Sequence, residues 1–236
     1  MNKTKIYISA PFGNYLRPKN TIPVLGTFTL DKRSGLLSQI AKTLRYSFKD
    51  KCWYNALGLR NPGIEIGINR HKPDTILSIA AIEPTDWALL EQKIPKNISL
   101  ELNISCPNIV HFNDYAKGIG CFSARNPIIK LSPNMTFSDV DSLIDQGFSK
   151  FHAVNTLKTP KGARSGKVLR EYSTKFINHI KNVDEKNIVI AGGGITSVED
   201  IIYYKNVGAD AYSLGTVCFN LLKLRRILKN VTEDFL

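Results

Sequence analysis

Two asparagines flank a cysteine where an apolar segment ends, at 101–108 with the sequence Glu-Leu-Asn-Ile-Ser-Cys-Pro-Asn. Amide side chains carry both donors and acceptors, so Asn103 and Asn108 suit the edge of a planar imide or ureide ring. Cys106 between them can serve as a base or as a nucleophile. It can equally be a buried cysteine in a loop broken by proline. This segment alone leaves both interpretations open.

Three further segments place polar side chains beside apolar runs. Residues 55–63, Asn-Ala-Leu-Gly-Leu-Arg-Asn-Pro-Gly, begin with Asn55 and otherwise have the composition of turns. Lys130 ends an apolar run, where a strand end would direct it into a pocket, although a lysine in such a place is usually just solvated. Asn155 follows another apolar run and precedes Thr156. Together the segments supply amides, a thiol and an ammonium group.

In this order the segments resemble the dihydroorotate dehydrogenase family, and the cysteine resembles its cytosolic class, in which a Cys is the catalytic base. The resemblance implies FMN-dependent oxidation of dihydroorotate to orotate in pyrimidine biosynthesis. Cys106 would act as general base on the C5 proton while hydride passes from C6 to flavin N5, and Lys130 would stabilise negative charge on the flavin ring. The implied substrate residues are Asn55, Leu57, Gly58, Leu59, Asn103, Asn108, Asn155 and Thr156.

Two glycine-containing turns in the C-terminal third suit a phosphate group. Residues 188–197 run from an apolar strand through glycines to a helix start, and residues 211–216 repeat the pattern with Gly-Thr. The amides of such turns and the following helix N-terminus can bind a phosphate. The loop at 162–166 resembles the family's loop beside the flavin but differs from it at Ala163 and Arg164. Because the chain lacks the glycine pattern of a dinucleotide-binding unit, the two turns imply FMN rather than a dinucleotide. The implied cofactor residues are Gly26, Thr27, Asn103, Lys130, Ser165, Gly166, Gly192, Gly193, Gly194, Gly215 and Thr216.

Eight apolar runs, most of them separated by segments with helical spacing, indicate an α/β fold of the (β/α)8 TIM-barrel type, in a single flavin-binding domain over residues 1–236. The runs lie at about 4–9, 22–28, 74–81, 98–105, 127–132, 150–155, 187–192 and 210–215. The expected helices lie at 84–94, 138–147, 169–182, 197–208 and 217–230, with Ser138 and Ser197 as N-caps and Gly147 and Gly208 as terminators. Cys106 and Lys130 would then lie at the carboxyl ends of strands, where barrel enzymes form active sites.

Two departures from the family concern the first part of the chain. Residues 11–21 between the first two runs leave no room for a full helix, so we expect a shortened first β/α unit. Gly26 stands where the family has a lysine that contacts flavin and substrate. The charge would then have to come from Lys19, Lys32 or Arg164, or FMN would be held weakly.

Composition bounds the setting and the partners. The four cysteines show no metal-ligand spacing, the histidines are scattered, and no secretory or transmembrane stretch stands out. We therefore expect a cytoplasmic protein with no metal and no membrane association. The resemblance implies fumarate or a separate NAD-linked subunit as electron acceptor, and a homodimer is compatible with it. The net charge of +12 suits an anionic cofactor and substrate.

Two other functions are open on the sequence alone. A basic flavin barrel also resembles the tRNA dihydrouridine synthases, but the spacing around Cys106 fits them less well, and we do not expect nucleic acid as a partner. A barrel that binds flavin without turnover is favoured by Gly26, by Arg164 and by the short chain.

Overall fold

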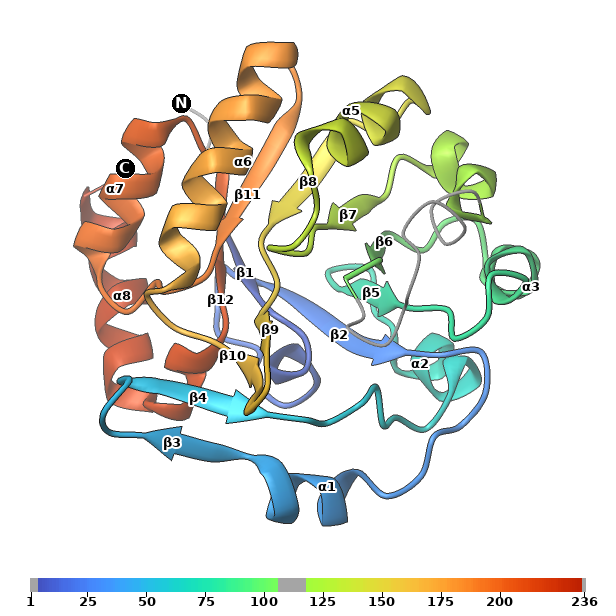
Figure 1. The fold of residues 1–236 in the computed structure, drawn as a ribbon, viewed down its shortest axis with the longest axis horizontal. Coiled ribbons are helices and arrows are strands. Elements are labelled where there is room, and N and C mark those ends of the chain that lie inside the picture. Colours follow the sequence, from blue (N-terminus) through green and yellow to red (C-terminus); the bar gives the residue numbers. More distant parts are fainter. Residues whose placement is uncertain (1–3, 106–117, 235–236) are drawn as a thin grey trace.

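Eight parallel strands close into a barrel in the order β1-β12-β11-β8-β7-β6-β5-β2 (Figure 1). This computed structural model describes residues 4–105 and 118–234. The barrel strands are β1 (Lys5–Ile8), β2 (Ile22–Phe28), β5 (Ile76–Ile79), β6 (Leu100–Asn103), β7 (Ile128–Lys130), β8 (Lys150–Ala153), β11 (Ile188–Gly192) and β12 (Ala211–Leu214). Every one of them lies inside an apolar run of the sequence, and the predicted barrel is confirmed.

The barrel interior has two layers of opposite character. The lower layer, near the amino ends of the strands, is an apolar cluster of Tyr7, Val24, Ile76, Ile128, Ile190 and Ala211. Side chains two positions apart on a strand face the same way, so the next inward positions define the upper layer. Those positions are Ser9, Gly26, Ser78, Lys130, Gly192 and Ser213, all of them polar or glycine. The barrel is therefore closed by hydrocarbon below and presents polar groups above.

Helices cover the outside of the barrel, and those predicted from spacing are confirmed with shifted ends. The predicted helices are α3 (Asp86–Lys93), α5 (Phe137–Asp145), α6 (Leu169–Val183), α7 (Val198–Val207) and α8 (Leu221–Asp234), whereas α2 (Ile64–Arg70) was not predicted. The last helix starts later than predicted because a 3-10 turn, η3 (Thr216–Phe219), precedes it. A second 3-10 turn, η2 (Gly120–Arg125), leads into β7. Among the described helices, none has the length and apolar character that crossing a bilayer requires.

The start of α5 differs from the sequence prediction. Ser197 caps α7 and Gly208 ends it, as predicted. The N-cap of α5 is Thr136 rather than Ser138, because the Thr136 hydroxyl accepts from the Asp139 amide while the Asp139 carboxylate accepts from the Thr136 amide. This reciprocal pair satisfies two amides of the first turn, and it leaves Ser138 inside the helix.

The first β/α unit is shortened, as the sequence predicts. Between β1 and β2 the only helical element is the 3-10 turn η1 (Phe12–Asn14). Gly13 allows this turn to lie directly on β2, since a Cβ there would come within 2.3 Å of the Val24 carbonyl oxygen. The Asn14 side chain then hydrogen-bonds both backbone groups of Gly26, at 3.0 Å each. The turn thus supports the strand at the point where its pairing with β5 shifts register.

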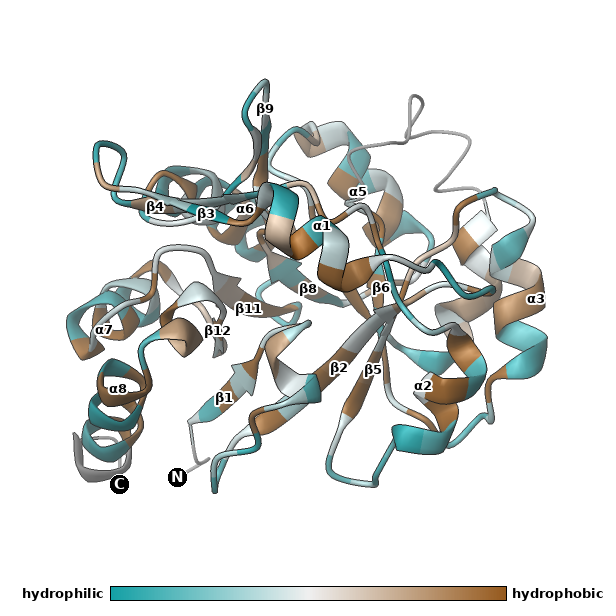
Figure 2. Ribbon diagram, turned by 90° about the horizontal axis from the view of Figure 1, so that it is seen from below, coloured by the Kyte–Doolittle hydropathy of each residue, from teal (hydrophilic) through white to brown (hydrophobic). Residues whose placement is uncertain are grey.

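A second sheet, not predicted from the sequence, lies across the end of the barrel (Figure 2). Its order is β3-β4-β10-β9, with antiparallel pairing throughout. The strands are β3 (Arg45–Ser47), β4 (Cys52–Asn55), β9 (Leu157–Thr159) and β10 (Gly162–Arg164), and α1 (Leu36–Thr43) precedes them. Since β9 follows directly on β8, the sheet covers the carboxyl ends of the barrel strands.

The capping difference gives a direct test. Thr136→Ala should lower the free energy of unfolding by about 1 kcal/mol, because it removes an N-cap. Ser138→Ala, two positions away, should leave it unchanged or raise it slightly, because alanine is the better residue inside a helix. Urea unfolding of both variants measures the difference. Equal effects of the two substitutions would show that the capping box at Thr136 does not form.

Candidate active site

A cavity of about 790 Å³ opens at the carboxyl ends of the barrel strands, beneath the second sheet. Its walls come from the barrel strands, from β4, β9 and β10, and from the turns η1 and η3. The sequence-predicted residues that line it are Gly26, Thr27, Asn55, Leu57, Gly58, Leu59, Asn103, Lys130, Asn155, Thr156, Ser165, Gly166, Gly193, Gly194, Gly215 and Thr216. Cys106 and Asn108 lie outside the described residues, and Gly192 is not part of the lining. One cavity thus gathers predicted residues from segments spread over most of the chain.

The amide groups of the cavity are ordered by one another. The Asn103 amide nitrogen donates to the Thr27 hydroxyl at 3.1 Å, and its oxygen accepts from the Ser105 hydroxyl at 2.6 Å. Asn155 donates to the same Asn103 oxygen at 3.4 Å and to the Ser105 hydroxyl. Ser105 was not among the predicted residues, although its place two positions after Asn103 on the same segment is a usable signal. The network holds the amides of two strand ends in one orientation.

A buried ionic group lies under this network. Glu101 on β6 is 1% exposed, and its carboxylate accepts from the Ser78 hydroxyl and from His152 Nδ1, each at 2.9 Å. Lys130 Nζ lies 3.7 Å from the same carboxylate. Burial raises the pKa of Glu101, but the Lys130 charge and the hydrogen bonds from His152 and Ser78 outweigh burial and lower it to about 2. The carboxylate is therefore ionised in the folded protein.

Glu101 and His152 were not predicted as site residues. The sequence signal for Glu101 is a carboxylate between Leu100 and Leu102 in an apolar strand, which needs a buried partner. The sequence gives no sign that His152 differs from the other scattered histidines. In the structure it lines the cavity, and it lies next to Lys130 in the pairing of β7 with β8. Among the residues that the structure describes, no cluster of His, Cys, Asp and Glu could hold a metal ion.

The glycine turn after β11 differs in detail from its predicted role. The N-terminus of α7 is already capped, since the Thr196 and Ser197 amides both donate to the Asp200 carboxylate, at 2.8 and 3.1 Å. Asp200 therefore occupies these two amides, and the binding of a phosphate by the glycine turn stays a prediction. Gly192 faces the barrel interior instead, where a Cβ would come within 2.5 Å of His152 Nε2.

Gly26 leaves no room for the family's lysine at its position. Its φ is +112°, and a Cβ there would lie 2.4 Å from the Ser78 carbonyl oxygen. The three cations considered as replacements, Lys19, Lys32 and Arg164, do not line the cavity. Arg164 instead points to Asp50, with its guanidinium 4.0 Å from that carboxylate. In this arrangement of the chain none of the three lines the cavity, and the approach of one of them to FMN by a loop rearrangement stays a prediction.

The comparisons identify the family. The model of the dihydroorotate dehydrogenase family matches residues 22–234, and the chain belongs to this family. The catalytic subunits of dihydroorotate dehydrogenase B (NAD(+)) from Bacillus cytotoxicus and Malacoplasma penetrans are 31% and 28% identical to it over 70% of its length. The matched stretch covers 65% and 66% of those two relatives, less than two thirds of their length.

Solved structures agree on the fold. The DHODH of Eimeria tenella in complex with ferulenol superposes with a TM-score of 0.77 at 17% identity, covering 97% of this chain and 81% of that one. The ligand-free form of the same enzyme gives a TM-score of 0.74 at 18% identity, covering 89% of this chain and 77% of that one. At this identity the likeness concerns the fold alone.

Replacing Gly26 should be costly. Gly147 also has a positive φ, +90°, but a Cβ there meets nothing within 4 Å. Gly147→Ala should therefore cost roughly 1–2 kcal/mol of backbone strain, whereas Gly26→Ala should cost roughly a further 1–3 kcal/mol from the collision with Ser78. Gly26→Lys should lower the free energy of unfolding at least as much as Gly26→Ala. Chemical unfolding of the variants measures this, and a Gly26→Lys protein as stable as the wild type would contradict the geometry.

The ionised Glu101 should make the protein acid-sensitive. A carboxyl whose pKa falls from its usual 4.5 to about 2 on folding adds stability above pH 4.5, which is lost as the pH falls toward 2. The full contribution corresponds to about 3 kcal/mol. The difference in unfolding free energy between the wild type and Glu101→Gln should therefore shrink through that window. A difference that stays constant from about pH 6 to about pH 3 would contradict the assignment.

Proposed function

We propose that the chain oxidises dihydroorotate to orotate with FMN, in pyrimidine biosynthesis. The observation that carries the proposal is the gathering, in one cavity, of the predicted glycines, amides and lysine from eight separate segments of a chain that belongs to the dihydroorotate dehydrogenase family. The family match favours this reading over the resemblance to tRNA dihydrouridine synthases. The names of the relatives in Bacillus and Malacoplasma support it further.

The residues that line the cavity are chemically suited to binding FMN. Gly193, Gly194 and Gly215 bring bare backbone to one side of it, where amides can approach a phosphate. At Gly194 a Cβ would lie 2.9 Å from the Lys167 backbone, so no larger residue fits that turn. Apolar and aromatic groups such as Trp53 and Phe219, whose ring centroids are 4.4 Å apart, supply a surface for a flat ring system. FMN would supply the hydride acceptor.

The protein groups would then have separate tasks. Asn55, Asn103, Asn108 and Asn155 would hold the edge of the pyrimidine. The hydrogen bond from Asn155 to Asn103, with the Ser105 hydroxyl that contacts both, would keep two of these amides in place before substrate enters. Cys106 would remove the C5 proton. A free thiol has a pKa near 8.5, so this step should speed up as the pH rises.

The relatives' names support a proposal for the electron acceptor. Both are catalytic subunits of an NAD(+)-dependent enzyme, so we propose a separate NAD-linked subunit, with fumarate as the alternative. We propose no membrane partner, no nucleic acid and a cytoplasmic location. A homodimer is compatible with this function.

A second candidate is a barrel that binds flavin without turnover. It is favoured by Gly26, where no lysine fits, and by Lys130, whose charge already has a carboxylate beside it. Anaerobic addition of dihydroorotate to the FMN-loaded protein separates the two. Bleaching of the flavin absorbance supports the enzyme, and an unchanged spectrum supports the binding protein.

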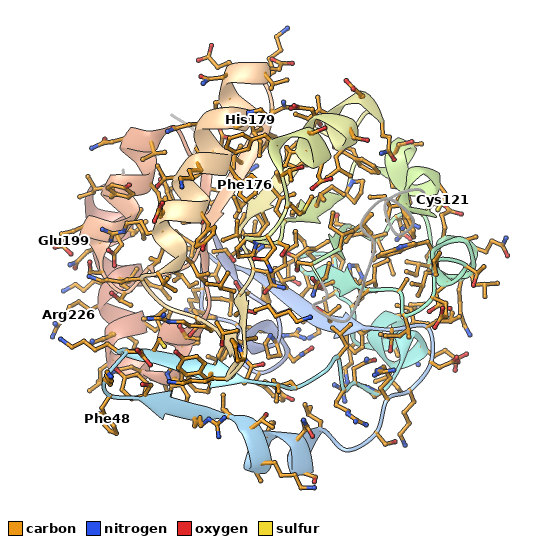
Figure 3. All side chains as sticks on the ribbon, viewed as in Figure 1. Phe48, Cys121, Phe176, His179, Glu199 and Arg226 are labelled. Carbon is orange, nitrogen blue, oxygen red and sulfur yellow. The ribbon has the colours of Figure 1, made fainter. Side chains whose placement is uncertain are left out.

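Cys106→Ala should abolish this bleaching while FMN and orotate still bind, because the thiol moves a proton and other groups hold the ligands. Cys106→Ser should keep a slow reaction at high pH. The control is Cys121→Ala, since Cys121 is exposed on η2 and its thiol donates to the Gly118 carbonyl at 3.2 Å (Figure 3). Wild-type bleaching rates in Cys106→Ala at every pH would rule out this base.

A further inference from the structure

The cavity floor carries no net charge. Glu101 is ionised, and Lys130, 4% exposed, is the cation that faces it. Burial and the nearby Lys130 charge lower the pKa of His152, against the opposing effect of Glu101, so the imidazole is neutral. One positive and one negative charge therefore cancel. Lys130 alone does not leave a free positive charge for a negative ligand.

Glu101 also sets which nitrogen of His152 carries the proton. An ionised carboxylate can only accept hydrogen bonds, so Nδ1, 2.9 Å away, must be the protonated nitrogen. Nε2 is then an unprotonated acceptor. It lies against Gly192, where the missing Cβ provides its space, and His152 forms part of the cavity floor. The imidazole is thus held ready to accept one proton on the side away from Glu101.

We propose that His152 takes up a proton at Nε2 when a flavin bound in this cavity is reduced. The inference rests on the proposed FMN site. Hydride transfer adds two electrons and one proton to the flavin and leaves it with one negative charge. A proton drawn from solvent onto His152 gives the floor a net charge of plus one, and the buried charges balance. No other reactant is needed.

The groups that face His152 come from several strands. Glu101 on β6 favours the protonated imidazole, and Lys130 on β7 opposes it. Ser78 on β5 donates a hydrogen bond to the same Glu101 carboxylate. On β11 the neighbour of the imidazole is Gly192, which has no titrating group. Tyr7 on β1 stays protonated, since burial and then the Glu101 charge raise its pKa. In this part of the floor, His152 is the group whose ordinary pKa lies nearest neutrality.

The midpoint potential of bound FMN, measured between about pH 6 and about pH 9, tests the proposal. The wild type should take up two protons for two electrons, which doubles the slope against pH relative to one proton. His152→Gln should give the one-proton slope. The control is His179→Gln, since His179 also pairs with a carboxylate, Asp141 at 2.6 Å, but lies between α5 and α6 on the outside of the barrel (Figure 3). It should keep the wild-type slope.

Each outcome is decisive. A one-proton slope in the wild type overturns the proposal, and so does a two-proton slope that survives in His152→Gln, since the second proton would then sit on the flavin. Nitrogen NMR of labelled histidines, with the His152 signals assigned by their loss in His152→Gln, should show Nδ1–H and a bare Nε2 in the flavin-free protein near neutral pH. The other tautomer, or a charged ring, also overturns it. Failure to bind FMN at all overturns the proposed function as well.

Discussion

The ionised Glu101 is the constraint on which the arrangement of the site depends. A buried carboxylate is tolerated only when charges and hydrogen bonds replace the water it has lost. Ser78, Lys130 and His152 provide them from three other strands. The same contacts orient the lysine, select the tautomer of the histidine, and require glycine at 192, where the imidazole occupies the space of a side chain. One charge thus determines the residue types on the strands around it.

The barrel could be predicted because each of its strands is buried on both faces and reads as an apolar run. The second sheet could not. Its strands are three or four residues long, and β4 pairs with β10, so that Asn55 lies opposite Ala163, more than a hundred positions away. Several barrel strands are equally short, but they are buried and apolar, whereas the strands of the second sheet are partly exposed and form no apolar run. Helix α1 (Leu36–Thr43) was also missed; it is as long as α3, but it buries none of its residues, whereas α3 buries Trp87 and Leu90.

Residues recognisable by family segments were found, and those recognisable only by their neighbours were not. Asn103, Lys130 and Asn155 stand in segments that can be matched, and all three line the cavity. The roles of Glu101 and His152 become visible only when β6 and β8 pair with the two sides of β7, which carries Lys130. Gly26 was read as a lost lysine, whereas its backbone conformation and the nearby Ser78 carbonyl admit no side chain at all. The sequence around Gly26 cannot show this steric conflict, because it arises from Ser78 on another strand.

The two layers of the barrel interior also separate the residues that determine packing from those that determine the chemistry of the cavity. Substitutions among Val24, Ile76 and Ile128 alter packing density and change no charged or titratable group of the cavity. Two positions further along the same strands, a substitution alters charge or hydrogen bonding and hardly affects the hydrocarbon core. The chemistry of the cavity can therefore change during evolution while the apolar lower layer keeps the fold stable. In a lineage that lost or gained a reaction, we expect the substitutions in the barrel interior to lie in the upper layer.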